Sequence, residues 1–423
     1  MEDCLTDSEL LTQFHKNTPQ LRFSGFDDDW EEKKLGEIVT EVKRKADSNS
    51  TAPIMMISAT QGFINQSEKY SADNAGSSLK NYTLLKKGEL SYNHGYSKTR
   101  NFGSCFTLGI DEARIPFVYH SFSLDSDDPS FFGKYLNSGL FDKELKKRVA
   151  STARMDGLLN ISFDEYVSLI VKKPTLAEQQ KIGAFLSHVD SLIQAKTKKL
   201  ESLKAVKKSL LQKCFPKDGE KVPEMRFAGF SGDWEEKKLG DMGTTFTGLS
   251  GKSKEDFGYG NARYLTYISV YKNEISSIEG TDKINIDNSQ NTLKYGDILF
   301  TTSSEIPEEV GLSSVWLGNE DNIYLNSFCF GYRLRDNIDL LYMAYLLRSF
   351  YVRPQIILLA QGISRYNISK YKVMDVKVLL PSLTEQQKIG QFFAKYDSLI
   401  STQQKEIDKL KDIKKSLLQK MFV

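Results

Sequence analysis

The sequence has few cysteine and histidine residues, and none of them is spaced to form a disulfide framework or a metal site. It contains no C-x-x-C pair, and its histidines show no ligand spacing. The residues are Cys4, Cys105, Cys214, Cys329, His15, His94, His120 and His188. Zinc modules and disulfide scaffolds need close pairs of such residues, so we expect no bound metal.

Long apolar runs and catalytic motifs are also missing. No stretch approaches the roughly 18 uninterrupted apolar residues of a membrane span, and the first 20 residues do not resemble a basic, apolar leader. The sequence contains no GxxxxGK[ST] loop, no GxGxxG after a strand, no GxSxG and no HExxH. It also lacks the Asn/Asp-Pro-Pro-aromatic tetrapeptide of amino-methyltransferases. We therefore expect a cytoplasmic protein without catalytic residues of its own.

What is present is an ordinary globular composition in a chain too long for one core. The chain has 423 residues, of which 40% are hydrophobic, 11% aromatic and 26% charged, which favours two domains. The net charge of +2 is small for a nucleic-acid binder. Residues 196–221 nevertheless hold nine lysines against three acidic residues, which we interpret as a solvated lysine face on a helix.

The chain repeats itself at two places. Residues 19–36 (PQLRFSGFDDDWEEKKLG) return as residues 223–240 (PEMRFAGFSGDWEEKKLG), with 13 of 18 positions identical. Residues 174–193 (PTLAEQQKIGAFLSHVDSLI) return as residues 381–400 (PSLTEQQKIGQFFAKYDSLI), with 13 of 20 identical. Between these segments the two halves diverge. Two copies that share these segments but differ between them should have the same kind of function at two places, with different specificity at each.

The second repeated segment predicts two long helices. Thr175 with Glu178, and Ser382 with Glu385, have the spacing of a capping box, so the helices should start near residues 175 and 382. Apolar residues then recur every 3.5 positions on average over more than thirty residues, as in a coiled-coil seam. For pairing and partner docking we predict Ile182, Leu186, Val189, Ile193, Leu200, Leu203, Ile389, Phe393, Tyr396, Ile400, Ile407 and Leu410.

Connectivity favours an antiparallel helix pair that serves as a spacer between two heads. Each seam also has one polar residue at an equivalent position, Lys196 and Gln403, which would specify register. The alternative is that each amphipathic helix packs on its own domain. We predict an α+β fold of two pseudo-symmetric mixed α/β domains joined by two long antiparallel coiled-coil helices. The expected segments are a tail (1–18), a first head (19–174), a central helix (175–216), a second head (217–381) and a distal helix (382–423).

Within the heads the pattern predicts matching elements. We expect strands with turns over 53–64 and 82–92 and a helix over 130–149 in the first head. The second should have strands over 264–275 and 293–302 and a helix near 339–349. The acidic residues around Trp30 and Trp234 could hold a metal in a nuclease, but their place in the shared frame favours the polar edge of a first strand.

The loops of the variable blocks are rich in residues that suit nucleic acid. Arginine and lysine bind guanine edges, asparagine and glutamine bind adenine edges, and hydroxyl groups bind phosphates. The DNA-binding candidates are Thr60, Gln61, Tyr92, Asn93, His94, Tyr96, Lys98, Arg100 and Arg154, and in the second block Tyr271, Lys272, Thr301, Thr302, Ser303, Ser304, Ser364, Arg365 and Tyr366. Arg154 and Arg365 each precede an Asn-Ile-Ser triplet, and a structural salt bridge is the other interpretation of both.

The repeated motifs resemble those of the specificity subunit of type I restriction-modification systems, over nearly the whole chain. The motifs are R-F-x-G-F-x-x-x-W at 22–30 and 226–234, W-E-E-K-K-L-G, and L-x-E-Q-Q-K-I followed by a helix that ends in K-K-S-L-L-Q-K. The resemblance implies that each variable block is a target-recognition domain that reads half of a bipartite site in double-stranded DNA.

The same resemblance implies partners and cofactors. Two methyltransferase (M) subunits would dock on the helices and methylate adenine at N6 with S-adenosylmethionine. Up to two restriction (R) subunits would add cleavage of unmodified DNA that depends on ATP and Mg, and no cofactor would be bound by this chain itself. The alternative is a coiled-coil scaffold whose duplicated heads bind proteins and not DNA, an interpretation that the small net charge favours. A two-lobed enzyme is disfavoured because catalytic motifs are missing.

Overall fold

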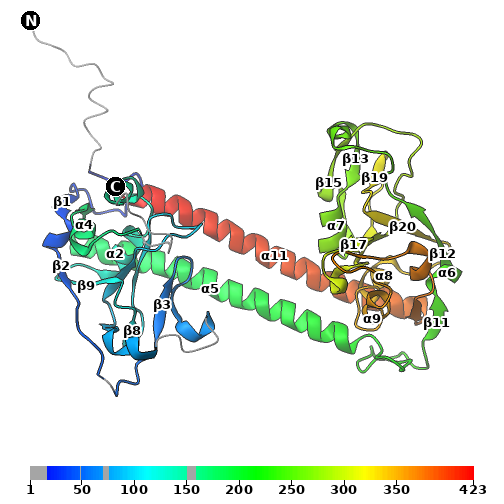
Figure 1. Cartoon of the computed structure of the whole chain (residues 1–423), viewed down its shortest axis with the longest axis horizontal. Coiled ribbons are helices and arrows are strands. Elements are labelled where there is room, and N and C mark those ends of the chain that lie inside the picture. Colours follow the sequence, from blue (N-terminus) through cyan, green and yellow to red (C-terminus); the bar gives the residue numbers. More distant parts are fainter. Residues whose placement is uncertain (1–16, 48, 70–75, 150–158) are drawn as a thin grey trace, which may run out of the picture. The chain divides into compact units, whose positions relative to one another are not determined.

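Two compact units make up the molecule (Figure 1). The computed structural model describes residues 17–47, 49–69, 76–149 and 159–423. The first unit comprises Met1–Lys196 and Glu406–Val423, and the second comprises Thr197–Lys405. Each unit contains one mixed head and a part of both long helices. The predicted α+β fold class is confirmed.

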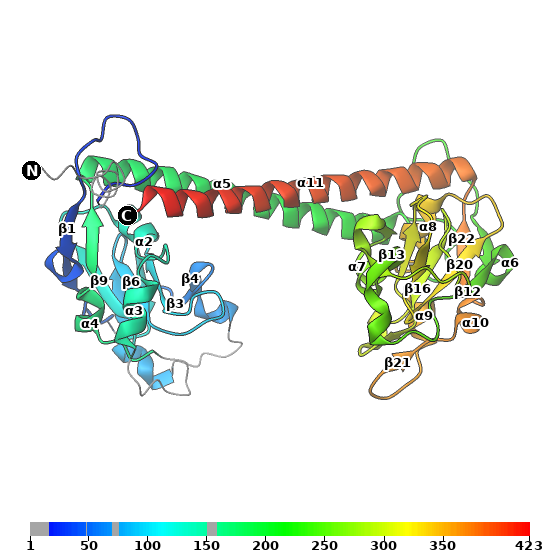
Figure 2. The same ribbon diagram turned by 90° about the horizontal axis from the view of Figure 1, so that it is seen from above.

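Two long helices run antiparallel within each unit. Helix α5 covers Leu176–Lys213 and helix α11 covers Leu383–Met421, so both begin where the sequence predicts. In the first unit the ion pairs between them are Lys196–Glu406 (2.6 Å) and Asp190–Lys414 (2.5 Å). In the second unit Lys207 of α5 contacts Asp397 of α11. Residue numbers increase in opposite directions along the two helices, and both views show them side by side within each unit (Figure 2).

The first head contains a four-stranded antiparallel sheet in the order β2-β9-β6-β7 and three two-stranded sheets, β1-β10, β3-β4 and β5-β8. Its strands are β1 (Glu31–Lys34), β2 (Val39–Glu41), β3 (Met55–Ser58), β4 (Gly62–Asn65), β5 (Thr83–Lys86), β6 (Leu90–Asn93), β7 (Ser104–Thr107), β8 (Glu112–Ile115), β9 (His120–Leu124) and β10 (Ile170–Lys173). Its short helices are α2 (Pro129–Tyr135), α3 (Asp142–Arg148) and α4 (Phe163–Val167).

The second head has a five-stranded sheet in the order β12-β20-β16-β18-β14, a three-stranded sheet β15-β13-β19, and the pairs β11-β22 and β17-β21. Its strands are β11 (Glu235–Lys238), β12 (Gly243–Thr247), β13 (Phe257–Leu265), β14 (Ile275–Ser276), β15 (Thr281–Ile284), β16 (Ile298–Thr301), β17 (Ser303–Ser304), β18 (Ser313–Trp316), β19 (Ile323–Leu325), β20 (Cys329–Leu334), β21 (Tyr366–Asn367) and β22 (Lys377–Leu380). Its short helices are α6 (Leu239–Met242), α7 (Tyr267–Lys272), α8 (Leu340–Leu346), α9 (Arg353–Ile357) and α10 (Lys370–Val373).

Two of the predicted elements need correction. The helix predicted over 130–149 is two helices, α2 and α3, because the chain turns between them at Gly139, whose φ is +93°. The strand predicted over 264–275 ends at Leu265, and helix α7 follows. The side chain of Thr266 accepts a hydrogen bond from the Ser269 amide, so this N-cap outweighs the strand propensity of the aromatic and β-branched residues that follow.

The predicted capping boxes are not completed: the Ser382 hydroxyl accepts a bond from the Glu385 amide at 3.4 Å, but each glutamate side chain binds a distant arginine. Glu178 accepts two bonds from the Arg22 guanidinium, at 2.8 and 2.8 Å, and its side chain is fully buried. Glu385 holds Arg226 in the same way, at 2.7 and 2.8 Å. These bonds raise the pKa of both arginines. The repeated N-terminal motif of each copy is thereby tied to the start of a long helix by a bidentate ion pair.

Other contacts of the frame are duplicated as well. The Leu21 amide donates to the Lys420 carbonyl at 2.8 Å, and the Met225 amide donates to the Lys213 carbonyl at 2.8 Å. Each repeated tryptophan lies in a core, since Trp30 and Trp234 are 1% and 2% exposed. Strands β1 and β11, which follow these tryptophans, pair antiparallel with β10 and β22. The acidic residues of the first strands therefore lie on a sheet edge, as expected. None of the described helices has the length and apolar composition of a membrane span.

Candidate nucleic-acid interface

In the second head, two regions that the sequence marks out lie in one place. Strands β17 and β21 pair antiparallel, with Ser304 opposite Tyr366. The Ile368 amide also donates to the Thr302 carbonyl at 3.0 Å. The Thr302 amide and hydroxyl both bind the Phe328 carbonyl, at 2.9 and 2.8 Å. Candidates about sixty residues apart in the chain thus form one continuous surface.

A hairpin at residues 361–367 extends from this surface near β21 (Figure 2). Gln361 and Asn367 exchange two main-chain hydrogen bonds of 2.9 Å. Gly362 has φ +141°, and a Cβ there would lie 2.0 Å from the Arg365 carbonyl, so only glycine fits. Ser364 and Arg365 are exposed, and Ile363 is 97% exposed. The hairpin therefore presents an arginine to solvent.

Helix α7 forms the wall beside β17. The Tyr267 hydroxyl donates to the Ser303 carbonyl at 2.6 Å, and its ring stacks on that of Tyr271 at 6.1 Å. The neighbouring Glu309 carboxylate raises the pKa of Tyr271, and it also accepts a bond from the Ser304 hydroxyl at 3.2 Å. Tyr271 is half-buried and Lys272 is exposed. The two predicted residues of α7 therefore border the same surface.

Three of the second-head candidates are buried. Thr301, Ser303 and Ser304 are 0%, 6% and 8% exposed, and the Thr301 hydroxyl accepts a bond from the Leu312 amide at 3.1 Å. Their side chains cannot reach a ligand in this conformation. The candidates with accessible side chains are Tyr271, Lys272, Thr302, Ser364, Arg365 and Tyr366.

In the first head several candidates turn inward. Tyr92 is 1% exposed, its hydroxyl donates to the Phe102 carbonyl at 2.7 Å, and burial raises its pKa. The Asn93 amide group donates to the Ile57 carbonyl at 3.3 Å. His94 is 8% exposed. These side chains fold the loop after β6 and are not open to a ligand.

The remaining first-head candidates are more open. Tyr96 is 58% exposed, and Lys98 is also exposed. Arg100 is fastened to its own loop, because its Nε donates to the Gly103 carbonyl at 3.4 Å and its Nη2 lies 3.6 Å from Asp142. Thr60 and Gln61 form the exposed turn between β3 and β4. The prediction for Arg154 lies outside the described residues.

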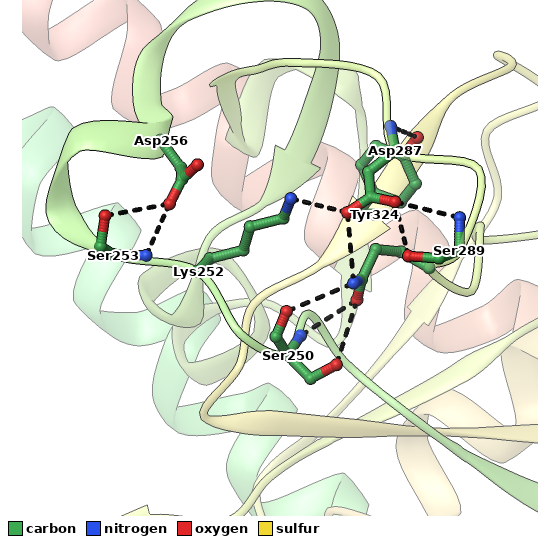
Figure 3. Close-up of polar contacts among 8 residues, drawn as sticks. Ser250, Lys252, Ser253, Asp256, Asp287, Ser289 and Tyr324 are labelled. Carbon is green, nitrogen blue, oxygen red and sulfur yellow. Dashed lines mark hydrogen bonds and ion pairs between the residues drawn. The ribbon is translucent and has the colours of Figure 1, made fainter.

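One cationic side chain of the second head is neutralised within its loops (Figure 3). The Lys252 ammonium binds Asp287 at 2.6 Å, and this bond, followed by bonds from Ser289, lowers the pKa of Asp287. Gln290 joins the same loops through the Ser250 amide at 3.0 Å. Lys252 therefore fastens the two loops together, and its charge is balanced before any ligand approaches.

The comparisons with known proteins agree with this architecture. Residues 231–412 match the family described as Type I restriction modification DNA specificity domain. The chain is similar to specificity subunits of type I restriction-modification systems. A protein of Methanocaldococcus jannaschii, whose name describes it as the MjaX specificity subunit of a type I restriction enzyme, is 23% identical over 97% of each chain.

Solved structures give the same fold. The S subunit of a type I restriction-modification system from M. genitalium has a TM-score of 0.57 at 15% identity, covering 96% of this chain and 99% of that one. A structure that describes complex assembly and conformational transition of the type I system has a TM-score of 0.53 at 15% identity, covering 95% and 99%. The likeness to these structures concerns the fold. The family match over residues 231–412 includes every accessible candidate of the second head.

The helix residues predicted for pairing are mostly buried. Within the units Ile182, Leu186, Val189, Leu200, Ile389, Phe393 and Ile407 are buried, while Ile193, Leu203, Tyr396, Ile400 and Leu410 are half-buried. Lys196 is half-buried and bonded to Glu406, and Gln403 is 6% exposed. Residues buried in this way are occupied within the units and offer little surface to a partner.

Sequence reasoning missed a second apolar stripe on the same helices. Leu192 and Val206 of α5 are 39% and 45% exposed, and their repeat equivalents Leu399 and Ile413 of α11 are 47% and 43% exposed. All four occupy the g position of the heptad that places the seam at a and d. Charged residues are usual at that position, so its apolar character is the signal that could have identified the stripe.

Proposed function

We propose that this chain is the DNA-reading subunit of a type I complex, in which each head reads one half of a bipartite double-stranded target. The helix pair sets the number of unread bases between the halves. It also docks two methyltransferase subunits, which modify adenine at N6, and restriction subunits add ATP-dependent cleavage of unmodified DNA. Reading by the second head takes place on the surface formed by α7, Thr302 and the 361–367 hairpin, which β17 holds together from below.

The observation that carries this proposal is the duplication of individual contacts around unlike loops. The equivalent pairs are Arg22–Glu178 and Arg226–Glu385, Phe23–Phe185 and Phe227–Phe392, and Asp190–Lys414 and Asp397–Lys207. The candidate loops that this frame supports differ in sequence, although the turns at Gly88 and Gly296 keep equivalent bonds. Two domains with the same supporting contacts but different loops suit a protein that recognises two different sequences of one kind of ligand.

The exposed stripe at the g positions supports docking of two copies of one partner. Within the first unit it consists of Leu192 and Ile413, and within the second of their equivalents, Leu399 and Val206. Exposed apolar residues in register on a helix pair favour a helical or apolar partner surface. Since the two sets are equivalent under the repeat, the same partner surface fits both. Two methyltransferase subunits meet this requirement.

The cofactors belong to the partners in this proposal. S-adenosylmethionine binds to the methyltransferase subunits, and ATP and Mg bind to the restriction subunits. The methyltransferase also extrudes the target adenine from the duplex. The residues of this chain contribute position and selectivity, because they place each docked catalyst over a chosen half-site.

The decisive experiment is long-read sequencing of modified adenines in a host that carries the methyltransferase with or without this chain. We expect methylation at one bipartite motif only when the chain is present. Binding of the purified complex to that motif should also weaken steeply with salt, because each neutralised phosphate adds about 0.9 to the log–log slope.

The contrary result would favour the other function. If no adenine motif depends on the chain, and if any DNA binding is insensitive to salt, the heads do not read DNA. The exposed Ile363 and the small net charge would then be explained better by a scaffold whose heads bind proteins.

A further inference from the structure

A half-buried arginine behind the second head's surface holds the end of helix α7. The Arg348 guanidinium donates to four main-chain carbonyls, those of Ser313 (2.7 Å), Val270 (2.8 Å), Tyr271 (3.0 Å) and Asn273 (2.8 Å). Three of these carbonyls lie at the C-terminal end of α7, where a helix leaves its last carbonyls without partners. One side chain therefore both satisfies that end and fixes its position against β18.

The position of α7 is passed on to the reading surface. Tyr267 at the start of α7 donates to the Ser303 carbonyl of β17 at 2.6 Å. Tyr271 near its end faces Glu309, and Glu309 binds Ser304 at 3.2 Å. Strand β17 in turn pairs with β21, which leads back to the exposed hairpin. A shift of α7 would therefore move the candidates of both the helix and the hairpin.

Arg348 is also linked to the helix pair within the same unit. Burial lowers the pKa of Arg348, and the charge of the nearby Glu274 carboxylate opposes this shift. The Lys207 ammonium of α5 binds Glu274 at 3.0 Å and also contacts Asp397 of α11. Asp397 accepts a bond from the Tyr345 hydroxyl at 2.7 Å. The charges alternate in sign from Asp397 through Lys207 and Glu274 to Arg348, so each is compensated by its neighbours.

We propose that Arg348 is a positioning residue for reading the second half-site, and that Lys207 and Glu274 anchor it to the helix pair. The inference rests on the proposed function and names a residue behind the surface that sets its geometry. Lysine cannot replace this arginine fully, because it has three donors on one atom and no planar fork. Helices α2 and α8 are equivalent, since Asp128 and Asp339 cap them in the same way, and the first head has Asn137 where Arg348 follows α8. The effect therefore belongs to one half-site.

The test uses the complex with its methyltransferase and the target found by adenine sequencing. Methylation rates are measured on duplexes with the intact target and with a single base changed in the first or the second half-site. For Arg348→Met we expect discrimination at the second half-site to fall about ten-fold, the scale of one good base contact. Discrimination at the first half-site should stay at the wild-type value. Arg348→Lys should give partial rescue.

The matched control is Arg335→Met on the same head. Arg335 is exposed and makes one long bond, 3.4 Å, to the Asp241 carbonyl, so its removal should leave both half-sites as in the wild type. If Arg348→Met does not fold, Glu274→Gln keeps a hydrogen-bond acceptor for Lys207 but removes the charge that compensates Arg348. It should reduce second-site discrimination by about two- to five-fold.

Two outcomes overturn the inference. One is wild-type discrimination at the second half-site in a folded Arg348→Met protein. If that protein does not fold, the same result in Glu274→Gln counts. The other is an equal loss at both half-sites, which would indicate general destabilisation. A wild-type complex that methylates without sequence preference would instead contradict the proposed function itself.

Discussion

The two central histidines of the first head hold its loops in place. His94 and His120 stack at 4.9 Å with their planes 8° apart. His94 bonds to the Val118 carbonyl at 2.9 Å, and His120 bonds to the Ile161 carbonyl at 2.6 Å. The two side chains therefore hold the segments around Val118 and Ile161 in place. In this conformation both histidines are structural residues, because their rings are bonded to main-chain carbonyls of the same head.

This arrangement makes the first head sensitive to acid. Burial lowers the pKa of His120 below its ordinary 6.5 and outweighs the bond to Ile161, and His94 lowers it further, while Glu41 opposes the shift. Above pH 6.5 the ring is neutral in both the folded and the unfolded chain. As pH falls below 6.5 the unfolded chain binds a proton more readily, so this part of the stability is lost toward the lower, folded pKa.

Thermal unfolding at pH 7.5 and 5.5 checks this expectation. The wild type should lose more stability on acidification than His120→Gln, which keeps a donor for the Ile161 carbonyl but does not titrate. The second head provides an internal comparison, because residues 189–423 contain no histidine. An equal loss in both proteins would show that His120 does not control the response.

At the scale of the element, the sequence predicted what depends on local periodicity. The length of α5 and α11 follows from their heptads, and both helices start beside Thr175 and Ser382, as the local pattern predicts. The role of Glu178 was missed, because its partner Arg22 lies 156 residues away and no local pattern reveals such a pair. Helix α7 was missed because its residues favour strand, and only the Thr266 cap decides otherwise.

For the loops of the candidate surface, the sequence could predict only the amino-acid composition. The sequence indicated that hydroxyl, amide and cationic groups gather there, but not which of them point outward. Thr301 and Arg365 were equal candidates, and the structure buries the first and exposes the second. The difference arises from pairing between β17 and β21 and from the tight hairpin at Gly362, both of which depend on tertiary contacts.

The exposed stripe of the long helices gives a prediction about assembly. Leu192→Glu and Leu399→Glu each place a charge on one copy of the stripe, where 39% and 47% exposure leaves the helix pair intact. A docked subunit would bury this charge without a group of opposite charge beside it, which is costly. Each substitution should therefore remove one docked methyltransferase subunit. Native mass spectrometry of the complex should show one bound copy for either single variant and none for the double variant.

The control for this prediction uses glutamate on the same helices at solvent-facing positions. Gln194→Glu and Ser401→Glu lie two residues beyond the stripe and are exposed, so both should retain two partner subunits. Loss of both copies from a single stripe variant would mean that the two sites are not independent, and the docking assignment would need revision.

At the scale of the whole molecule, the proposed function assigns reading and spacing to different parts. The heads carry the unlike loops, whereas the contacts that the repeat duplicates lie where each head meets the long helices, as in Arg22–Glu178 and Arg226–Glu385. The gap between half-sites should then depend on helix length alone. Changing that length should leave the identity of each half-sequence untouched.

A seven-residue duplication in each helix, inserted after Lys199 and after Glu406, tests this separation. Both positions are g positions, so the seam keeps its phase, and each helix grows by about 10 Å at 1.5 Å per residue. With DNA rising 3.4 Å per base pair, the unread gap should lengthen by up to about three base pairs. Adenine sequencing should show both half-sequences unchanged at the new spacing.

The matched control places the same seven residues in the exposed turn at Asp218 and Gly219, outside both helices. This variant has the same added length of chain but an unaltered helix pair, so its target should keep the original gap. A changed half-sequence in the helix variant would contradict the proposal that the heads recognise the bases and the helices set the spacing, since no loop of the heads has been altered. An unchanged gap in a folded, active helix variant would show that the heads, and not the helices, determine the spacing.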